Sequence, residues 1–195
     1  AGPLALKILS PDISHKTDAG GVMLNLEPER VDQAAHDMLD RVRRNEPAAR
    51  IQGFVLQPMI QRPNAQELLA GVVRDATFGP VVMFGHGGVA VEVIADRTMG
   101  LPPLDDSLAQ DMVSRTRVAA LLKGYRDRPA ADLDAVCGVL IRLGQIALDL
   151  PEVAELDINP LLADAGGVSA LDARIRLSRD PVRSAIRPYP ADLER

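Results

Sequence analysis

Three groups of residues in this sequence have types and spacings that could support chemistry. The first lies in SPDISHKTDAGGV, where His15, Lys16 and Asp18 come directly before the glycine pair at 20–21. A neutral imidazole is a nucleophile at neutral pH, and a neighbouring lysine attracts an anionic reactant. Glycines after such residues allow a loop to move. The stretch therefore indicates either covalent catalysis at His15 or an ordinary surface loop.

The second group lies in two strand patterns, 155–164 and 167–177, that flank residues 165–166. A strand alternates its faces, so the two acids that precede Asn159 at alternate positions share its face. If the hairpin turn is centred on 165–166, residues whose numbers sum to 331 lie opposite each other, and Asn159 faces Asp172. Neighbouring amide and carboxylate oxygens suit Mg²⁺. The alternative is an exposed polar sheet face with no ligand.

The third group consists of single polar residues at strand positions. Lys7 interrupts the apolar run LALKIL, and Glu67 opens ELLAGVV. On an edge strand Lys7 would simply be solvated, whereas a lysine that projects into a cleft would bind phosphate. Glu67 is either a carboxylate that accepts ribose hydroxyls or an ordinary surface acid.

GHGGVA at 85–90 satisfies the dinucleotide pattern G-x-G-x-x-G/A. That fingerprint requires a helix to begin at the glycines, so that its amides face the pyrophosphate. Here the glycines lead into VAVEVIAD, which alternates like a strand and disfavours a Rossmann site. Two interpretations remain: a tight turn, or a loop whose backbone amides approach a nucleotide phosphate.

Composition excludes several classes of protein. The 195 residues carry 22 Lys and Arg against 27 Asp and Glu, and the net charge of -5 disfavours a nucleic-acid partner. The sequence has no Trp, two Tyr and three Phe, too few for base-stacking platforms. The lone Cys137 excludes an internal disulfide and is expected in the core. No signal peptide or membrane span is visible, so we expect a soluble, cytoplasmic protein.

The positioning elements follow from periodicity. After strands at 4–9 and 22–26, Pro28 begins a helix with apolar residues at helical spacing and His36 off that stripe. Four β-like segments follow, which implies antiparallel pairing, and then two helices. These elements are the strands 53–60, 67–75, 80–85 and 88–96, and the helices 105–122 and 130–149.

The ordered stretches LALKI, SHKTDAGGV, QPMI, FGPVVMFGHGG, ELDINPL and ALDARI resemble the ATP-grasp domain of the nucleoside-diphosphate-forming acyl-CoA synthetases, the acetate-CoA ligase family. The resemblance covers residues 3–177. It implies an α+β (α/β) ATP-grasp fold, N-terminally truncated, in which two subdomains with antiparallel-rich sheets flanked by helices grip ATP or ADP and Mg²⁺. The expected parts are a smaller subdomain at 1–62, a larger one at 63–178 and a linker tail at 179–195.

The resemblance also implies roles for individual residues. His15 is similar to the histidine that accepts a phosphoryl group, and Asn159 and Asp172 are similar to the Mg²⁺ ligands. Lys7 would contact phosphates, residues 57–59 would form a hinge beside adenine, and Glu67 would face ribose. The implied nucleotide contacts are Lys7, Gln57, Pro58, Met59, Glu67, Gly85, Gly87 and Gly88. His86 departs from the apolar residue of relatives, and its role is open.

In this family the reaction is acyl-CoA + ADP + phosphate to acid + CoA + ATP, and the ATP-grasp part works with CoA-binding and ligase domains of the same or a partner chain. Those domains are absent here, so we expect the isolated chain to be inactive alone. The tail SAIRPYPADLER is similar to a linker to a GNAT-type acyltransferase domain. That similarity favours, as an alternative, a regulatory domain without synthetase turnover. A third possibility is an interaction domain with vestigial motifs.

Overall fold

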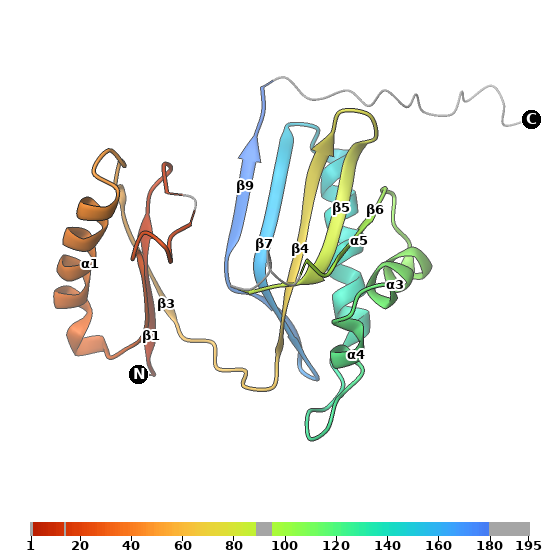
Figure 1. The fold of residues 1–195 in the computed structure, drawn as a ribbon, viewed down its shortest axis with the longest axis horizontal. Coiled ribbons are helices and arrows are strands. Elements are labelled where there is room, and N and C mark those ends of the chain that lie inside the picture. The colour runs from red at the N-terminus through yellow and green to blue at the C-terminus, as the bar shows by residue number, and fades with distance from the viewer. Residues whose placement is uncertain (1, 14, 89–94, 180–195) are drawn as a thin grey trace, which may run out of the picture. The chain divides into compact units, whose positions relative to one another are not determined.

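The computed structural model describes residues 2–13, 15–88 and 95–179 (Figure 1). The chain divides into two compact units, residues 1–61 and 62–195. Each unit is an α+β structure in which helices flank an antiparallel sheet, as the sequence predicts. The two units are described separately.

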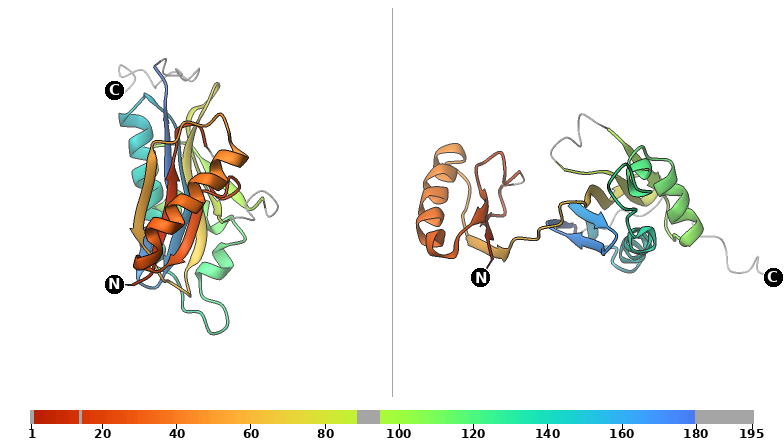
Figure 2. Two further views of the ribbon diagram at one scale, coloured as in Figure 1. Left: turned by 90° about the vertical axis from the view of Figure 1, so that its left-hand side faces the viewer. Right: turned by 90° about the horizontal axis from the view of Figure 1, so that it is seen from below.

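The first unit contains a three-stranded antiparallel sheet in the order β2-β1-β3. One long helix, which a single 3-10 turn precedes, covers a face of this sheet (Figure 2). The elements are β1 (Leu4–Leu9), β2 (Val22–Leu26), η1 (Pro28–Arg30), α1 (Val31–Asn45) and β3 (Gly53–Pro58).

Helix α1 packs on the sheet through residues spaced four apart, which a 3.6-residue period places on one face. Ala34, Met38 and Val42 are buried there with Leu6 and Ile8 of β1. Burial of a side chain such as Met or Ile contributes about 1.5–3 kcal/mol. The stripe therefore fixes which face of β1 is covered. His36 is exposed, as expected.

The second unit contains a six-stranded antiparallel sheet. Its order is β6-β5-β4-β7-β8, and β9 also pairs with β7. The strands are β4 (Gln66–Asp75), β5 (Gly79–His86), β6 (Arg97–Gly100), β7 (Val153–Asp164), β8 (Gly167–Ala170) and β9 (Ala173–Leu177). Arg62, at the start of the unit, donates hydrogen bonds to Asp164 and Ser169 and so holds the β7–β8 turn.

Three helices cover one face of this sheet: α3 (Asp106–Ser114), α4 (Ala119–Leu122) and α5 (Leu133–Asp149). Figure 1 shows α5 running along the strands. Cys137 is buried in α5, as predicted. Among the described helices, none has the length and hydropathy that crossing a membrane requires.

The prediction of a single helix at 105–122 is wrong, because the segment forms two helices, α3 and α4. Asp96 causes the break. Its buried carboxylate accepts hydrogen bonds at 2.8 Å from the backbone N–H groups of Arg117 and Val118, which begin a new helix there. A carboxylate supplied from a distant part of the chain is invisible to helical periodicity.

The strand expected at 88–96 falls mostly on residues 89–94, which lie outside the described residues. Gly88, Ala95 and Asp96, at its two ends, are not in a strand. A short strand, β6, instead begins at Arg97 and pairs with β5. The strand expected at 167–177 is divided into β8 and β9 by an interruption at 171–172, and the remaining predicted strands are present with small shifts at their ends.

Candidate functional site

The register of the last three strands brings Asn159 and Asp172 opposite each other. Ile158 pairs with Ala173 and Leu161 pairs with Ala170, so both flanking pairs have the predicted sum of 331. Asn159 lies within β7, and Asp172 lies in the short interruption between β8 and β9. The predicted hairpin register is therefore confirmed.

The side chain of Asn159 connects this hairpin to the glycine loop. Its Oδ1 accepts a hydrogen bond of 2.9 Å from the backbone N–H of Gly88. Gly88 has a φ of 81°, and a Cβ at this position would overlap the carboxylate of Glu67. A side chain at this φ is strained, and here it would also have to displace the Glu67 carboxylate. Glu67, Gly88 and Asn159 thus meet at one point, although they lie far apart in the sequence.

The other two glycines of the loop have packing reasons of their own. A Cβ on Gly85 would overlap the backbone of Asp96 and Arg97, and one on Gly87 would overlap the backbone of Leu68. Their absence of a side chain lets neighbouring segments approach closely. Of the three predicted phosphate contacts, Gly88 is therefore the one that lies beside polar side chains.

His86 belongs to the opposite face of the sheet. It pairs with Leu68, whose neighbours along the same face, Ala70 and Val72, are buried in the helix-covered core. Successive strand residues alternate faces, so Glu67 is on the other side. The Nδ1 of His86 lies 3.0 Å from the carbonyl oxygen of Gly87. His86 is next to the glycine loop but not on its polar face.

Two further acids share the face of Asn159. Burial, and next the charge of Glu155, raise the pKa of Asp157, while Arg174 lowers it and Asp172 raises it. Acids that repel each other in this way are typical of cation-binding or catalytic sites. Sequence reasoning placed Asp157 on this face but gave it no role; the alternation itself was the signal.

The described residues contain no cluster of three His, Cys, Asp or Glu side chains able to hold a metal ion. An ion at this face would therefore need the amide oxygen of Asn159 and ligands from outside the protein. Mg²⁺ accepts such a set, because it commonly keeps water and phosphate oxygens.

In the first unit, Lys7 and Gln57 share the sheet face that α1 does not cover. Lys7 pairs with Val55 and Ala5 pairs with Gln57, so the two polar side chains are diagonal neighbours. β1 is the central strand of its sheet, between β2 and β3, so the edge-strand alternative for Lys7 does not apply. Met59, just past β3, donates from its N–H to the carbonyl oxygen of Pro3.

His15 is exposed in the loop between β1 and β2, on a segment held at both ends. Ile13 and Ala19 are buried on either side of it. Asn45 of α1 donates a hydrogen bond of 3.2 Å to the carbonyl oxygen of Ala19. Asp12 accepts hydrogen bonds at 2.8–2.9 Å from the side chain and backbone of Arg50, and these lower its pKa to about 2.

The glycine pair after His15 closes this loop. Gly20 has a φ of 74°, and a Cβ there would overlap Arg41, whereas one on Gly21 would overlap Ile8. The glycines let the loop pack on α1 and β1 while His15 stays outside. A shallow hollow beside His15 is lined by Asp12, Ile13, Asp18, Ala19 and Glu46.

The predicted residues thus form two groups, each assembled within its own unit. The first unit holds His15, Lys7 and the segment 57–59, and the second holds Glu67, Gly88, Asn159 and Asp172.

Comparison with known proteins agrees with the family resemblance found in the sequence. Residues 1–177 match the family model described as an ATP-grasp domain. The chain is 38% identical over 178 residues to an ADP-forming acetate–CoA ligase I of Archaeoglobus fulgidus, covering 91% of this chain and 26% of that protein. It is 35% identical over 176 residues to the beta subunit of an ADP-forming acetate–CoA ligase I of Pyrococcus furiosus, covering 90% and 75%. The chain therefore spans about a quarter of the first relative.

Solved structures of a dinucleotide forming acetyl-coenzyme A synthetase 1 from Ca. Korarchaeum cryptofilum also match. The complex with coenzyme A, Ca-AMPCP and HgCl⁺ gives a TM-score of 0.85 at 40% identity, covering 90% of this chain and 76% of that chain. A complex of the same protein with coenzyme A and Mg-AMPPCP gives 0.76 at 36% identity and the same coverage. Its phosphohistidine segment points towards the nucleotide binding site.

Proposed function

This chain belongs to the ATP-grasp family, within the ADP-forming acetate–CoA ligases, and from that membership we propose that it binds Mg-nucleotide and exchanges a phosphoryl group between nucleotide and His15. The observation that carries this proposal is the hydrogen bond between Gly88 and Asn159, which unites the glycine loop, the Glu67 strand and the acidic hairpin. Residues 1–62 and 63–178 would act as the smaller and larger subdomains.

Nucleotide recognition would use both groups of residues. Lys7 would neutralise phosphate oxygens as a point charge, and the backbone of residues 57–59 would lie along the base. Glu67 is exposed at the start of β4, where a carboxylate can accept hydrogen bonds from ribose hydroxyls. The N–H of Gly88 is already used by Asn159, so its contribution is to hold the loop in place.

The polar face of the second unit fits Mg²⁺. An amide oxygen has two lone pairs, and Gly88 occupies one of those on Asn159. Asp172 lies opposite and would supply a carboxylate. Burial, and next the charge of Glu155, raise the pKa of Asp157, and a cation bound nearby would stabilise its ionised form. Mg²⁺ bound there would neutralise charge that develops on the transferring phosphoryl group.

His15 is the proposed acceptor because it is exposed between two buried anchors. An unprotonated ring nitrogen would form a bond to the γ-phosphorus of ATP, while the bond from that phosphorus to the β–γ bridging oxygen breaks and ADP leaves with the electron pair. The reverse transfer makes ATP. Lys16, the next residue, would attract the phosphoryl group.

The complete reaction, acyl-CoA + ADP + phosphate to acid + CoA + ATP, would require CoA-binding and ligase domains from the same or a partner chain. The predicted GNAT neighbour rests on residues 184–195, which lie outside the described residues. That neighbour, the regulatory alternative and the cytoplasmic location stay predictions.

Titration calorimetry of the chain with ATP and ADP, with and without Mg²⁺, tests the nucleotide site. We expect Mg²⁺-dependent binding, and a loss of at least about tenfold in affinity, near 1.4 kcal/mol, for Lys7→Met and for Asp172→Asn. Asp127→Asn, an exposed acid elsewhere in the second unit, is the matched control. Unchanged affinity in Asp172→Asn, or an equal loss in the control, would overturn the assignment.

Labelling with γ-³²P-ATP tests the acceptor, together with the CoA-binding and ligase partner. We expect acid-labile, base-stable label that His15→Ala abolishes. His36→Ala is the control, because His36 is also exposed but lies on α1 and contacts the Asp32 carbonyl. Label that persists in His15→Ala would exclude this histidine.

A further inference from the structure

The chain that joins the two units is short and is anchored on both sides. On the side of the first unit, the N–H of Met59 donates a hydrogen bond of 2.9 Å to the carbonyl oxygen of Pro3. The second unit begins at Arg62, whose side chain is bound to the β7–β8 turn. Ile60 and Gln61 lie between these anchors and are exposed. We call residues 60–61 the connector.

The guanidinium of Arg62 makes four hydrogen bonds to the β7–β8 turn. Two of them form a fork on the Asp164 carboxylate, in which Nε donates to Oδ2 at 2.7 Å and Nη2 donates to Oδ1. Nη1 donates to the hydroxyl of Ser169, and Nη2 also donates to the carbonyl oxygen of Gly167, both at 3.2 Å. A bidentate arginine–carboxylate pair fixes orientation as well as adding energy. The fork therefore fixes the Arg62 side chain on the turn.

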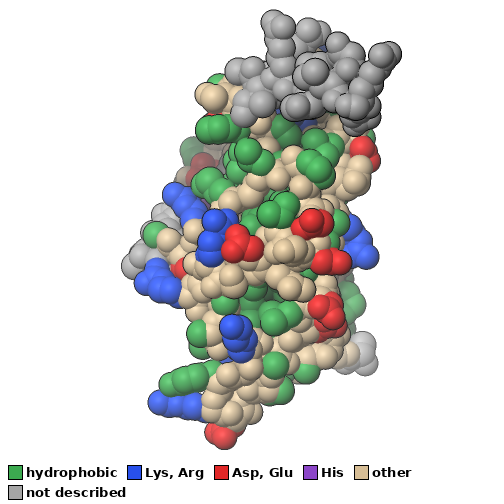
Figure 3. Space-filling view, turned by 90° about the vertical axis from the view of Figure 1, so that its right-hand side faces the viewer, with side chains coloured by type: hydrophobic (Ala, Val, Ile, Leu, Met, Phe, Trp, Pro, Cys, Tyr) green, Lys and Arg blue, Asp and Glu red, His purple; other side chains and the backbone are tan. Residues whose placement is uncertain are grey.

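Arg62 and Asp164 are more enclosed than ordinary surface charges. Their side chains are 17% and 18% exposed. By contrast, Figure 3 shows charged side chains spread among apolar ones over the surface on the side that carries α3. The hydrogen bond from Arg62, and next that from the N–H of Gly166, lower the pKa of Asp164, so its carboxylate is ionised at neutral pH. A partly buried ion pair is screened less by salt than an exposed one.

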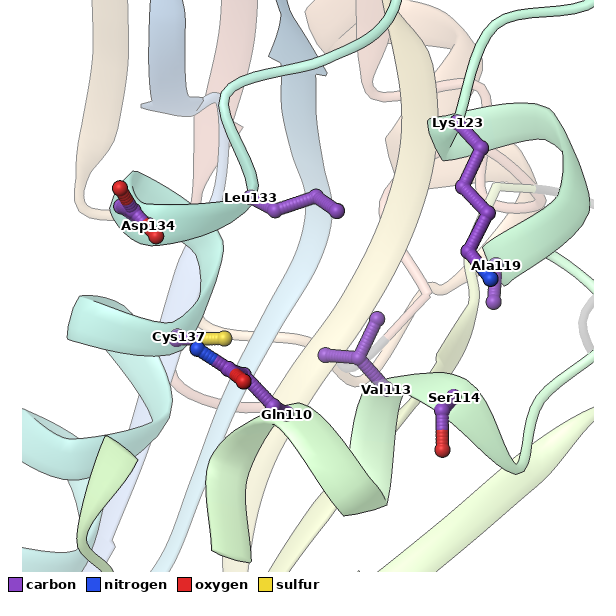
Figure 4. Close-up of a pocket in the computed structure, with 8 residues that line it drawn as sticks. All are labelled: Gln110, Val113, Ser114, Ala119, Lys123, Leu133, Asp134 and Cys137. Carbon is purple, nitrogen blue, oxygen red and sulfur yellow. The ribbon is translucent and has the colours of Figure 1, made fainter. Parts of the chain in front are cut away.

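The β7–β8 turn is itself attached to the helices of the second unit. The carbonyl oxygen of Asp164 accepts a hydrogen bond of 3.0 Å from the N–H of Asp132, the residue that caps α5. Figure 4 shows the next two residues, Leu133 and Asp134, at the start of α5 beside a hollow between the helices. Arg62 is therefore anchored to the packed body of the second unit.

The anchor at Arg62 sets the length of chain that is free to bend. With this anchor, the free chain is the two-residue connector. Without it, the next strand pairing is that of Gln66 with Ala163, so the six residues 60–65 would be free. The probability that the ends of a flexible chain stay in one arrangement falls as about the −3/2 power of its length. A threefold longer chain therefore lowers that probability about fivefold.

We propose that Arg62 is a positioning residue for nucleotide binding, because it confines bending to the connector. This inference rests on the proposed function, in which residues 57–59 lie along the base and the second unit holds the ribose and the metal ion. The chain from Met59 to Arg62 spans at most about 11 Å, so residues 57–59 stay close to the second unit however the connector bends. A nucleotide that contacts both units then has less motion to restrict when it binds.

Backbone order parameters from ¹⁵N relaxation, measured without nucleotide, test the connector directly. In the unchanged chain we expect values below about 0.6 at Ile60 and Gln61 and higher values from Arg62 onwards. In Arg62→Met the low values should extend through Ala65. Arg62→Lys should be intermediate, because one ammonium group cannot form the fork. The control is Arg74→Met, which removes an arginine of β4 that binds carbonyl oxygens at the end of α5, and its order parameters at 60–65 should be unchanged.

Asp164 tests the same anchor from its other side. Asp164→Asn removes the ionised half of the fork, so it should also extend the low order parameters beyond the connector. Adding Asp164→Asn to Arg62→Met should change them no further, because both substitutions break one contact. An unchanged profile in both single variants, or low values through Ala65 in the unchanged chain, would overturn the inference.

Calorimetry with Mg-ADP measures the consequence for binding. Arg62→Met should raise the dissociation constant about fivefold, whereas Arg74→Met should leave it unchanged. Insertion of Gly-Ser-Gly-Ser between residues 60 and 61 keeps the fork but lengthens the free chain from two residues to six. It should weaken binding by the same factor, an effect that a merely stabilising role of Arg62 does not predict.

Unchanged affinity for Mg-ADP in Arg62→Met, or in the chain with the insertion, would refute the positioning role. Failure of the proposed function gives a different result, since the unchanged chain would then not bind Mg-ADP at all. The order parameters are measured without nucleotide, so they decide in either case whether Arg62 confines bending to the connector.

Discussion

Replacement of Arg74 by methionine should destabilise the second unit without touching the candidate site. Arg74 lies on β4 and donates three hydrogen bonds to carbonyl oxygens: to Val153 at 2.7 Å, to Ala147 at 3.0 Å and to Leu150 at 3.3 Å. The latter two carbonyls belong to the end of α5, where a helix leaves its last carbonyls unpaired. One side chain therefore ties β4 to the end of α5 and the start of β7.

The size of the effect follows from these contacts. The two shorter bonds are each worth about 1 kcal/mol net, and a cation at a helix C-terminus adds about 0.3–1 kcal/mol. We expect Arg74→Met to lower the free energy of unfolding by about 2–3 kcal/mol. At about 4 °C per kcal/mol for a unit of this size, the melting temperature should fall by roughly 8–12 °C.

Calorimetric melting of Arg74→Met, Arg74→Lys and Arg128→Met measures this effect. Lysine has one ammonium group and cannot reach all three carbonyls, so Arg74→Lys should lie between the other two variants. Arg128→Met removes an exposed arginine and should melt like the unchanged chain. A fall of less than about 2 °C in Arg74→Met would show that water satisfies these carbonyls equally well, and the reasoning would be refuted.

Three other substitutions test the site and its supports. Asp157→Asn should raise the melting temperature at pH 7, because the raised pKa of Asp157 means that folding disfavours its ionised form. The gain in melting temperature should shrink as the pH falls towards 3.8, the ordinary pKa of an aspartate. A gain that stays constant with pH would contradict this explanation. Gly88→Ala should weaken Mg-nucleotide binding more than tenfold in calorimetry, because the added Cβ would displace the Glu67 side chain. The control is Gly138→Ala, which has space for a Cβ in α5. It should leave nucleotide binding unchanged and raise the free energy of unfolding by up to about 1 kcal/mol. Asp12→Asn should lower the melting temperature of the first unit at neutral pH, because it removes the ion pair with Arg50. The difference in melting temperature should disappear as the pH falls through the Asp12 pKa of about 2. An equal difference at neutral pH and at about pH 2 would exclude this ion pair as the cause.

The sequence pattern alone predicted the structure correctly where the environment of a residue depends on its neighbours in the sequence. The period of α1 predicted the face that Met38 and Val42 bury, because a helix carries its own geometry. The turn at 165–166 predicted that Asn159 faces Asp172, because an antiparallel hairpin has one register once its turn is known. Ordered motifs were sufficient to predict the family.

Tertiary structure decided whatever depends on segments that are distant in sequence. The carboxylate of Asp96 divides the expected helix in two, and a pairing partner places His86 on the helix-covered face. Gly88 meets Glu67 and Asn159 only because β4 lies between β5 and β7. Such contacts depend on strand order and helix packing, which a one-dimensional pattern does not contain.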